Sequence, residues 1–570
     1  MTKTGAFTFV LHSHLPYARQ AGFWPHGEEW VHEAIAETYV PLWDALNDLA
    51  DEGVDYRITV SVTPILAEQL ADPLIQEHFR VYAEERVAWA SQDIDRFEAA
   101  GDMTMRSLAE FYRDWYSARL ASFRDRYNSD LIGALKALQD RGLVEISTSA
   151  ATHGYLPLLS RDSSIYGQIQ TGVSSYERMF GRRPRAIWLP ECAYRPAYVQ
   201  ELPDGTTVTR PGLESYLAAQ AIRVFFSETH TVEGGHPVGK AAGEAIGTYG
   251  IVARRYAVTP TTEEQQQPGT TFRAYWVGDA AGKVAVLGRN NRTGQQVWSG
   301  DFGYPGDAAY REFHRKDSES GMQYWRIGGP GVDLGQKPTY DPGSAAERVA
   351  EHARHYVGLV EESLREYHAE SGEYGIIASN YDTELFGHWW FEGVDWLKQV
   401  LRGLAASDVV DLTTASAFVD EHASGVVMNL PESSWGSGGN HFTWMNRDTE
   451  WMWPIIHECE ITMETIVATY PDAQGDRREA LNHAARELLL LESSDWPFLV
   501  TTGQAKEYAI ERFRQHVERF QEAVSMAERD GDTLDADSRA RLNALVQKDN
   551  PFAGIDYTVF AGRQGSAELA

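Results

Sequence analysis

The chain has 570 residues, with 51 lysines and arginines against 82 aspartates and glutamates, so its formal net charge is -31. An acidic surface repels nucleic acid and anionic membranes, which excludes both as the main partner and favours an uncharged ligand. The 17 tryptophans and 27 tyrosines are many, and such rings serve either in a core or as stacking platforms for sugars. Two cysteines, Cys192 and Cys459, are too few for a disulfide framework and favour a reducing compartment.

Targeting signals are not evident in the sequence. The first apolar run, residues 6–11, is too short for the core of a signal peptide, and no run reaches the ~18 apolar residues of a membrane-spanning helix. We therefore expect a cytoplasmic protein that does not associate with a membrane. The sequence leaves the oligomeric state open, and a monomer is compatible with it.

Seven short apolar runs rich in β-branched residues predict strands. They cover residues 6–11, 57–63, 143–148, 186–189, 222–227, 283–287 and 375–379. Helix-like stretches, such as residues 29–49 and 212–221, lie between most of them, and this alternation predicts an α/β fold with a parallel sheet. Seven or eight such units suit a barrel, in which the chemistry lies at the carboxyl ends of the strands.

Three further regions depart from this alternation. Residues 193–211 contain an insertion and residues 228–282 are rich in Gly, Thr and Gln, so we expect lids, substrate walls or surface decoration there. Beyond about residue 415 the apolar residues follow helical spacing, as at Leu481, Ala485, Leu488 and Leu489 and at Ile510, Phe513, Val517, Phe520 and Val524. The predicted domains are a barrel at 1–192 and 283–414, insertions at 193–282 and a helical domain at 415–570.

Three histidines follow predicted strands. His12 and His14 lie on one side of an extended chain directly after the first run, and His153 follows the third. With Asp382 they fit a zinc site of a barrel hydrolase. They fit equally well as hydrogen-bond donors to a polyol, and each one alone is compatible with a structural role.

Carboxylates also stand at strand ends. Glu191 follows the fourth run and Asp382 the seventh, and two carboxylates facing one cavity are what glycosidic bond cleavage requires. Glu384 and Glu392 are rivals for the second role, and any single acid is also compatible with a helix cap or an ion pair. Cys192 is a weaker candidate nucleophile because no clear cationic activator stands beside it.

Several tryptophans stand among glycines and serines, which suggests exposed rings that stack on sugar faces. These predicted platforms are Trp24, Trp298, Trp435 and Trp444.

The sequence resembles glycoside hydrolase family 57, most closely its 1,4-α-glucan branching enzymes. The resemblance covers nearly the whole chain through five motifs, which are specific when taken together in order. They are His12 to Pro16, Glu145 to Leu158, Trp188 to Pro196, Tyr381 to Gly393 and Trp435 to Trp444.

The resemblance implies an incomplete (β/α)7 barrel with an inserted subdomain and a C-terminal α-helical domain. It implies Glu191 as the nucleophile and Asp382 as the general acid/base of a retaining reaction, with carboxyl groups about 5 to 5.5 Å apart. It also implies sugar contacts from His12, His14, His153, Trp435, Arg289, Gly306, Asp495 and Gln504. No metal or organic cofactor is expected, and the expected substrate is an α-1,4-glucan that serves as donor and acceptor.

One stretch departs from the family pattern. Branching members carry a lid with a tyrosine near its tip, whereas residues 230–247 here contain no tyrosine before Tyr249. An α-amylase or a 4-α-glucanotransferase is therefore the alternative within the family, because branching requires that water be excluded. Outside the family, the alternatives are a zinc-dependent hydrolase of carbon–nitrogen bonds and a glucan-binding protein without activity.

Overall fold

The computed structural model describes residues 3–201, 205–234, 269–280, 282–298, 303–329 and 331–562, together with short strands at Ile246–Gly247 and Gly250–Ile251. Most of the stretch on which the tyrosine-free lid was predicted, and Tyr249 itself, lie outside the described residues. None of the described helices combines the length and hydropathy of a membrane-spanning segment.

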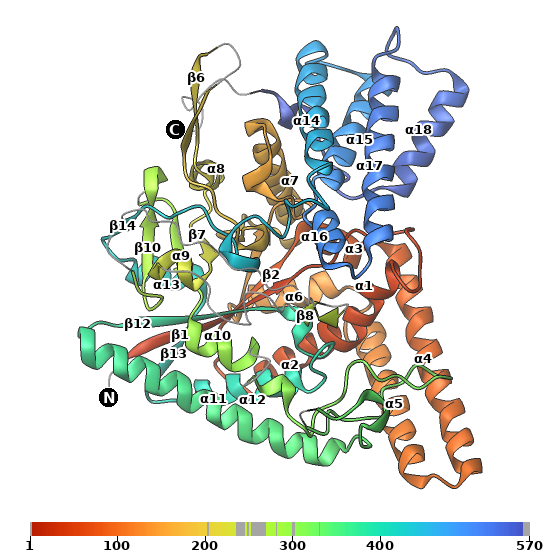
Figure 1. The fold of residues 1–570 in the computed structure, drawn as a ribbon, viewed down its shortest axis with the longest axis vertical. Coiled ribbons are helices and arrows are strands. Elements are labelled where there is room, and N and C mark those ends of the chain that lie inside the picture. Colours follow the sequence, from red (N-terminus) through yellow and green to blue (C-terminus); the bar gives the residue numbers. More distant parts are fainter. Residues whose placement is uncertain are drawn as a thin grey trace.

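A curled, mostly parallel sheet forms the centre of the molecule (Figure 1). Seven of its strands pair in parallel in the order β12-β1-β2-β3-β4-β7-β11. Their bounds are Gly5–Ser13 for β1, Ile58–Val62 for β2, Val144–Ser149 for β3, Ala186–Trp188 for β4, Val224–Ser227 for β7, Ala285–Gly288 for β11 and Gly375–Asp382 for β12. All seven strands predicted from the sequence are confirmed.

The barrel closes only partly. Just beyond β11, Arg289 makes an isolated parallel bridge with Ala378 of β12, and the Asn290 N–H donates to the Ala378 carbonyl over 3.0 Å. Strand β10 (Ala274–Val277) instead pairs antiparallel with β11, and β13 (Val410–Leu412) and β14 (Val427–Met428) extend the sheet to ten strands. The predicted incomplete (β/α)7 barrel is therefore confirmed.

The two faces of the sheet carry different cores. Alternate residues, such as Ala6 and Val10 of β1 and Ile376 and Ala378 of β12, form a small interior cluster with Phe418 of helix α13 (Ala415–His422). The intervening residues belong to the large core shared with the surrounding helices. The period of two along a strand produces this division, and it fixes which side chains face the interior.

Helices surround the strands, and two long ones form a hairpin at one side (Figure 1). The helices are α1 Glu28–Ala34, α2 Val40–Asp51, α3 Pro64–Ala71, α4 Pro73–Ala100, α5 Met103–Ala121, α6 Leu131–Asp140, α7 Asp162–Phe180, α8 Leu213–Ala219, α9 Thr229–Glu233, α10 Asn291–Trp298, α11 Pro342–Ser371 and α12 Gly393–Ala405. The predicted insertion after β4 contains an antiparallel hairpin of β5 (Tyr198–Glu201) and β6 (Thr207–Arg210).

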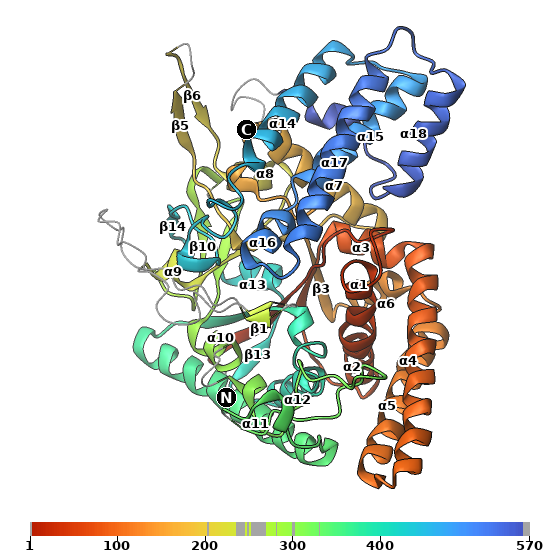
Figure 2. The ribbon, with the colours of Figure 1, turned by 45° about the vertical axis from the view of Figure 1, so that its right-hand side comes forward.

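The C-terminal region is a helical bundle, as predicted (Figures 1 and 2). Its helices are α14 Met452–Thr469, α15 Gly475–Leu491, α16 Asp495–Thr502, α17 Lys506–Ala527 and α18 Ala536–Lys548. Phe513 and Phe520 of α17 are fully buried, as their helical spacing predicts. The short helix α16 lies at the end of the bundle nearest the barrel, which brings its first residues to the carboxyl ends of the strands.

Candidate active site

The carboxyl ends of β1 and β12 bring two predicted site residues side by side. His12 is in register with Asp382 in the parallel β1–β12 pair. Both continue the interior alternation of their strands, since Val10 and Ala378 belong to the interior cluster. The sequence pattern of each strand therefore suffices to aim these two side chains into the barrel.

Glu191 reaches the site through unusual backbone geometry. It follows β4 in a short 3-10 turn, Pro190–Cys192, and its φ of 61° lies in the left-handed region, as does the φ of 49° at Cys192. Non-glycine residues adopt this region rarely and at a conformational cost, and such residues cluster at functional sites. His153 after β3 shares the feature, with a φ of 59°.

The Glu191 carboxylate is held by two hydrogen-bond donors from the C-terminal half of the chain. The Trp435 indole N–H donates to Oε2 over 2.7 Å, and the Ser494 hydroxyl donates to Oε1 over 3.3 Å. The Trp435 backbone N–H also donates to the Glu191 carbonyl over 3.0 Å. Trp435, predicted as a groove residue, therefore contacts the predicted nucleophile itself.

The three histidines form one polar cluster. His12 Nε2 lies 3.1 Å from His153 Nε2, and His153 Nδ1 lies 2.8 Å from the Ser494 hydroxyl oxygen. His14 lies between Thr63, 3.0 Å from its Nδ1, and Asp495, 2.9 Å from its Nε2. The rings of His14 and His153 stack with centroids 3.9 Å apart. The prediction that the three histidines gather at one rim is confirmed.

The Asp382 side of the site holds another acid, Glu384, which is buried. Glu384 Oε1 accepts hydrogen bonds from the His14 backbone N–H over 3.2 Å and from the Tyr39 hydroxyl over 2.5 Å. Tyr39 ends a π-helical segment, Ile35–Tyr39, between α1 and α2, and such segments recur at functional sites. Arg289, beyond β11, donates to Glu228 over 2.9 Å.

Burial raises the pKa of all three acids. It raises the pKa of Glu191 to about 7, against the Trp435 and Ser494 hydrogen bonds and the His14 charge, which lower it. It raises the pKa of Asp382 well above its usual range, and the charges of Glu384 and Glu191 raise it further, with Arg289 opposing them. It also raises the pKa of Glu384 to about 7. One proton-bearing and one ionised carboxyl can therefore coexist near neutral pH.

Burial acts in the opposite direction on the imidazoles. It lowers the pKa of His12 and of His153 well below the usual histidine range, so both rings are neutral. Burial also opposes the charge on His14, but its hydrogen bond and ion pair with Asp495 outweigh burial and raise the pKa of His14. The only histidine of this trio that favours the charged form is thus the one whose charge stabilises ionised Glu191.

The remaining predicted contacts are spread around this centre. Trp24 is exposed in the loop after β1, Trp298 is half-buried at the end of α10 and Gly306 is exposed at the end of a 3-10 turn, Tyr304–Gly306. Gln504 is half-buried just beyond α16, the helix that begins at Asp495. Their contact with substrate, like the carboxyl separation of about 5 to 5.5 Å, stays a prediction.

The structure does not support three of the predicted roles, those of Trp444, Glu392 and Cys192. Trp444 was expected to be exposed, but its ring is fully buried and stacks on Tyr155 with centroids 4.3 Å apart. Glu392, a rival for the second catalytic role, accepts from the Arg311 backbone N–H and the Tyr340 hydroxyl instead. Burial raises the pKa of Cys192 well above its usual range, which leaves a protonated thiol and no activated nucleophile.

Sequence reasoning missed several residues that complete the site. Ser494, Ser61 and Thr63 each contact one of the three histidines, and Tyr39 contacts Glu384. Ser61 and Thr63 lie at the end of the second predicted strand, and this position alone could have indicated that they are near the site. Ser494 immediately precedes a helix, where serine ordinarily indicates a cap, and its true contact depends on how the helical bundle docks.

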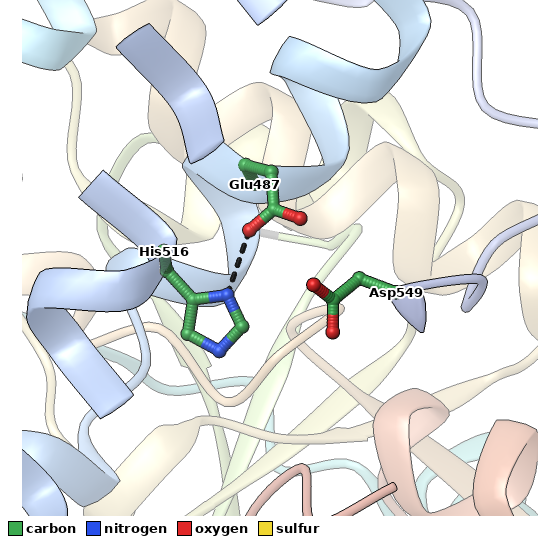
Figure 3. Close-up of side chains that lie close together, drawn as sticks. All are labelled: Glu487, His516 and Asp549. Atoms are coloured by element: carbon green, nitrogen blue, oxygen red, sulfur yellow. Dashed lines mark hydrogen bonds and ion pairs between the residues drawn. The ribbon is translucent and has the colours of Figure 1, made fainter. Parts of the chain in front are cut away.

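A metal site was the alternative for the histidines. Both nitrogens of each ring lie within hydrogen-bond distance of a protein group, so protein contacts account for the trio. Among the described residues, the acid and histidine set whose atoms approach closely enough for a metal is Glu487, His516 and Asp549 (Figure 3). His516 Nδ1 lies 2.7 Å from Glu487 Oε2, Arg512 lies 2.9 Å from His516 Nε2, and Arg519 lies 2.5 Å from Asp549 Oδ2. These side chains therefore pair with one another and with two arginines. This set braces α15 and α17 against the end of α18.

The chain is similar to known sequences over most of its length. Residues 8–431 match the sequence model of glycosyl hydrolase family 57, and residues 455–560 match that of the C-terminal region of 1,4-alpha-glucan branching enzymes. A 1,4-alpha-glucan branching enzyme of Thermococcus kodakarensis is 46% identical over 552 residues, which are 97% of this chain and 78% of the relative.

Two solved structures are similar over nearly their whole length. The crystal structure of a family 57 branching enzyme from Thermococcus kodakaraensis has a TM-score of 0.87 at 44% identity, covering 99% of this chain and 97% of that one. An alpha-amylase from Thermotoga maritima has a TM-score of 0.81 at 29% identity, covering 98% and 99%. The family model spans well over half of the chain, and Glu191 and Asp382 both lie within it. The chain therefore belongs to glycosyl hydrolase family 57.

Proposed function

We propose that this protein is a retaining 1,4-α-glucan branching enzyme, which cleaves α-1,4 linkages and forms α-1,6 linkages in a glycogen-type glucan. Within the family, branching is favoured by the match of residues 455–560 to the C-terminal region of branching enzymes. This region supplies Ser494 and Asp495, which contact Glu191 and His14. The matched region thus contributes two side chains to the site.

In the first proposed step, the Glu191 carboxylate attacks the anomeric carbon of an α-1,4-linked glucan. Asp382 gives its proton to the departing 4-oxygen, so the bond breaks and a glycosyl ester of Glu191 forms. The charge distribution supports these roles, since Glu191 receives two hydrogen bonds and the His14 charge while Asp382 faces two other carboxylates.

In the second step, Asp382 takes a proton from the 6-hydroxyl of another glucan chain. The freed oxygen attacks the anomeric carbon, Glu191 leaves as a carboxylate, and the two inversions give net retention. His12, His14, His153 and Trp435 lie around these two acids, and we infer that they bind the sugar at the cleavage point. This chemistry requires no cofactor, and we propose a cytoplasmic location for it.

Linkage analysis after incubation with amylose tests the proposal. We expect new α-1,6 signals in the proton NMR spectrum that outnumber new reducing ends. If reducing ends appear without branches, the protein is an α-amylase. That activity is the second candidate because the similar Thermotoga maritima structure is described as an alpha-amylase. Zinc that is stoichiometric and required for activity would instead indicate a metal-dependent hydrolase.

A further inference from the structure

Ser494 occupies the N-cap position of helix α16 but does not cap it. A serine at this position ordinarily accepts a hydrogen bond from a backbone N–H of the first helical turn. Ser494 has helical dihedral angles, φ -61° and ψ -20°, and its side chain makes no capping hydrogen bond to the described backbone of α16. Its hydroxyl turns instead toward the barrel, where it contacts His153 and Glu191.

The segment that carries Ser494 is fixed against the barrel by its backbone. The Ser494 N–H donates to the His153 carbonyl over 3.0 Å, and the neighbouring Ser493 makes an antiparallel bridge with Gly154. One residue earlier, Glu492 accepts a hydrogen bond from Gln168 of α7 over 2.8 Å. These contacts place the Ser494 hydroxyl independently of Glu191, so it can act as a fixed support for the carboxylate.

A series of hydrogen bonds links Ser61, His12, His153 and Ser494 to Glu191, and the donors and acceptors along it can be assigned. His12 and His153 are neutral, so each ring carries one N–H and one acceptor nitrogen. If Ser494 donates to Glu191, its oxygen accepts from His153 Nδ1–H. His153 Nε2 then accepts from His12 Nε2–H, and His12 Nδ1 accepts from the Ser61 hydroxyl. Each group in this hydrogen-bonded series donates to the group that is nearer the Glu191 carboxylate, and each bond polarises the next.

We propose that Ser494, supplied by the C-terminal helical region, is a positioning residue that fixes the orientation of the Glu191 carboxylate and connects it to His153 and His12. Because His153 Nδ1 lies 3.9 Å from Glu191 Oε1, the ring is too far for a direct hydrogen bond, and Ser494 bridges the two. The inference deepens the proposed function and rests on it, since Glu191 is the nucleophile only in that reaction.

The test compares Ser494→Ala with Ser494→Thr, which keeps the hydroxyl. The charged and titratable groups near Glu191 are His14 directly after β1, His153 and Tyr155 after β3, Cys192 after β4, Asp382 at the end of β12 and Asp495 at the start of α16. Neither substitution removes them. Loss of the hydroxyl removes one donor to ionised Glu191 and raises its pKa. The acidic limb of kcat/KM should therefore move to higher pH by roughly one pH unit.

We expect the alanine variant to lose up to about tenfold in kcat/KM at pH 6 and less above pH 8, with the loss mainly in kcat. The threonine variant should return the acidic limb to its wild-type position. Ser363→Ala, which removes a buried serine hydroxyl from α11, is the matched control and should leave the pH profile unchanged. Thermal unfolding curves check that each variant is folded. If the alanine variant does not fold, Ser494→Cys, which has a weak donor of similar size, should show an intermediate shift.

The experiments distinguish a failure of the proposed function from a failure of the role proposed for Ser494. A wild-type protein that neither transfers nor hydrolyses α-glucan would overturn the proposed function. An active wild type whose alanine or cysteine variant keeps the acidic limb in place would overturn the role of Ser494 alone, even if activity falls uniformly across the pH range.

Discussion

The surroundings of Glu191 stabilise a negative charge, whereas those of Asp382 disfavour one. At the end of β4, Glu191 receives hydrogen bonds from Trp435 and Ser494 and lies near His14, whose pKa is raised by Asp495. At the end of β12, half-buried Asp382 lies near Glu384, whose charge raises the pKa of Asp382, and Arg289 is the group that opposes this rise. Both acids are half-buried and desolvation raises the pKa of each, so burial alone does not distinguish them. Their neighbours do, and they assign the negative charge to Glu191 and the proton to Asp382.

Replacing Glu191 with glutamine should have the largest effect, because it removes the nucleophile while keeping the shape of the side chain. We expect turnover on amylose to fall by about 10³-fold or more, because no covalent intermediate can form. Glucan affinity, measured by titration calorimetry, should stay within a few-fold of wild type. Glu421→Gln, at an exposed position on α13, is the control. Persistent turnover would show that another residue is the nucleophile.

Asp382→Asn tests the proton-bearing end and should lower turnover on amylose by about 10²- to 10⁴-fold. The loss should be smaller with α-glucosyl fluoride, because its fluoride leaving group needs little protonation. Rates with both donors check this difference, and Asp420→Asn at an exposed position serves as the control. Equal losses with the two donors would contradict the assignment of Asp382 as the general acid.

Trp435→Phe tests the charge-stabilising end, since it keeps an aromatic ring but removes the N–H that donates to Glu191 over 2.7 Å. This hydrogen bond lowers the pKa of Glu191, so its loss should raise that pKa above about 7 and move the acidic limb of kcat/KM to higher pH. We expect about a tenfold loss at pH 6 and less at pH 8. Trp276→Phe, on β10, should leave the profile in place. An acidic limb that stays in place in Trp435→Phe would contradict this role.

The sequence predicted the parts of the site that local patterns determine. Alternation along β1 and β12 aims His12 and Asp382 inward, and both could be assigned from their strands alone. The contact between Ser494 and Glu191 joins residues 303 positions apart and depends on the docking of a separate helical bundle. The prediction that Trp444 is exposed rests on neighbouring glycines such as Gly436, and it is wrong. That glycine instead makes room for the buried ring, which would lie 2.6 Å from a Cβ at position 436.

The smallest expected effects belong to the Asp382 end of the site, and Glu384→Gln is the first of two tests there. The variant keeps an acceptor for Tyr39 and for the His14 N–H but removes a negative charge beside Asp382. That charge raises the pKa of Asp382, so its removal should lower this pKa and let the general acid lose its proton at lower pH. The basic limb of kcat/KM should therefore move to lower pH, with a loss of a few-fold at pH 8 to 9 and little change at pH 6.

Tyr39→Phe supplies an independent check of the same step. Removing the hydroxyl raises the pKa of Glu384, because the hydrogen bond from Tyr39 lowers it, and a larger fraction of Glu384 is then neutral near pH 7. The basic limb should move in the same direction as in Glu384→Gln, but less. A basic limb that moves to higher pH in either variant would mean that Glu384 does not keep Asp382 protonated, and the unequal charge of the two ends would then have to come from the Glu191 side alone.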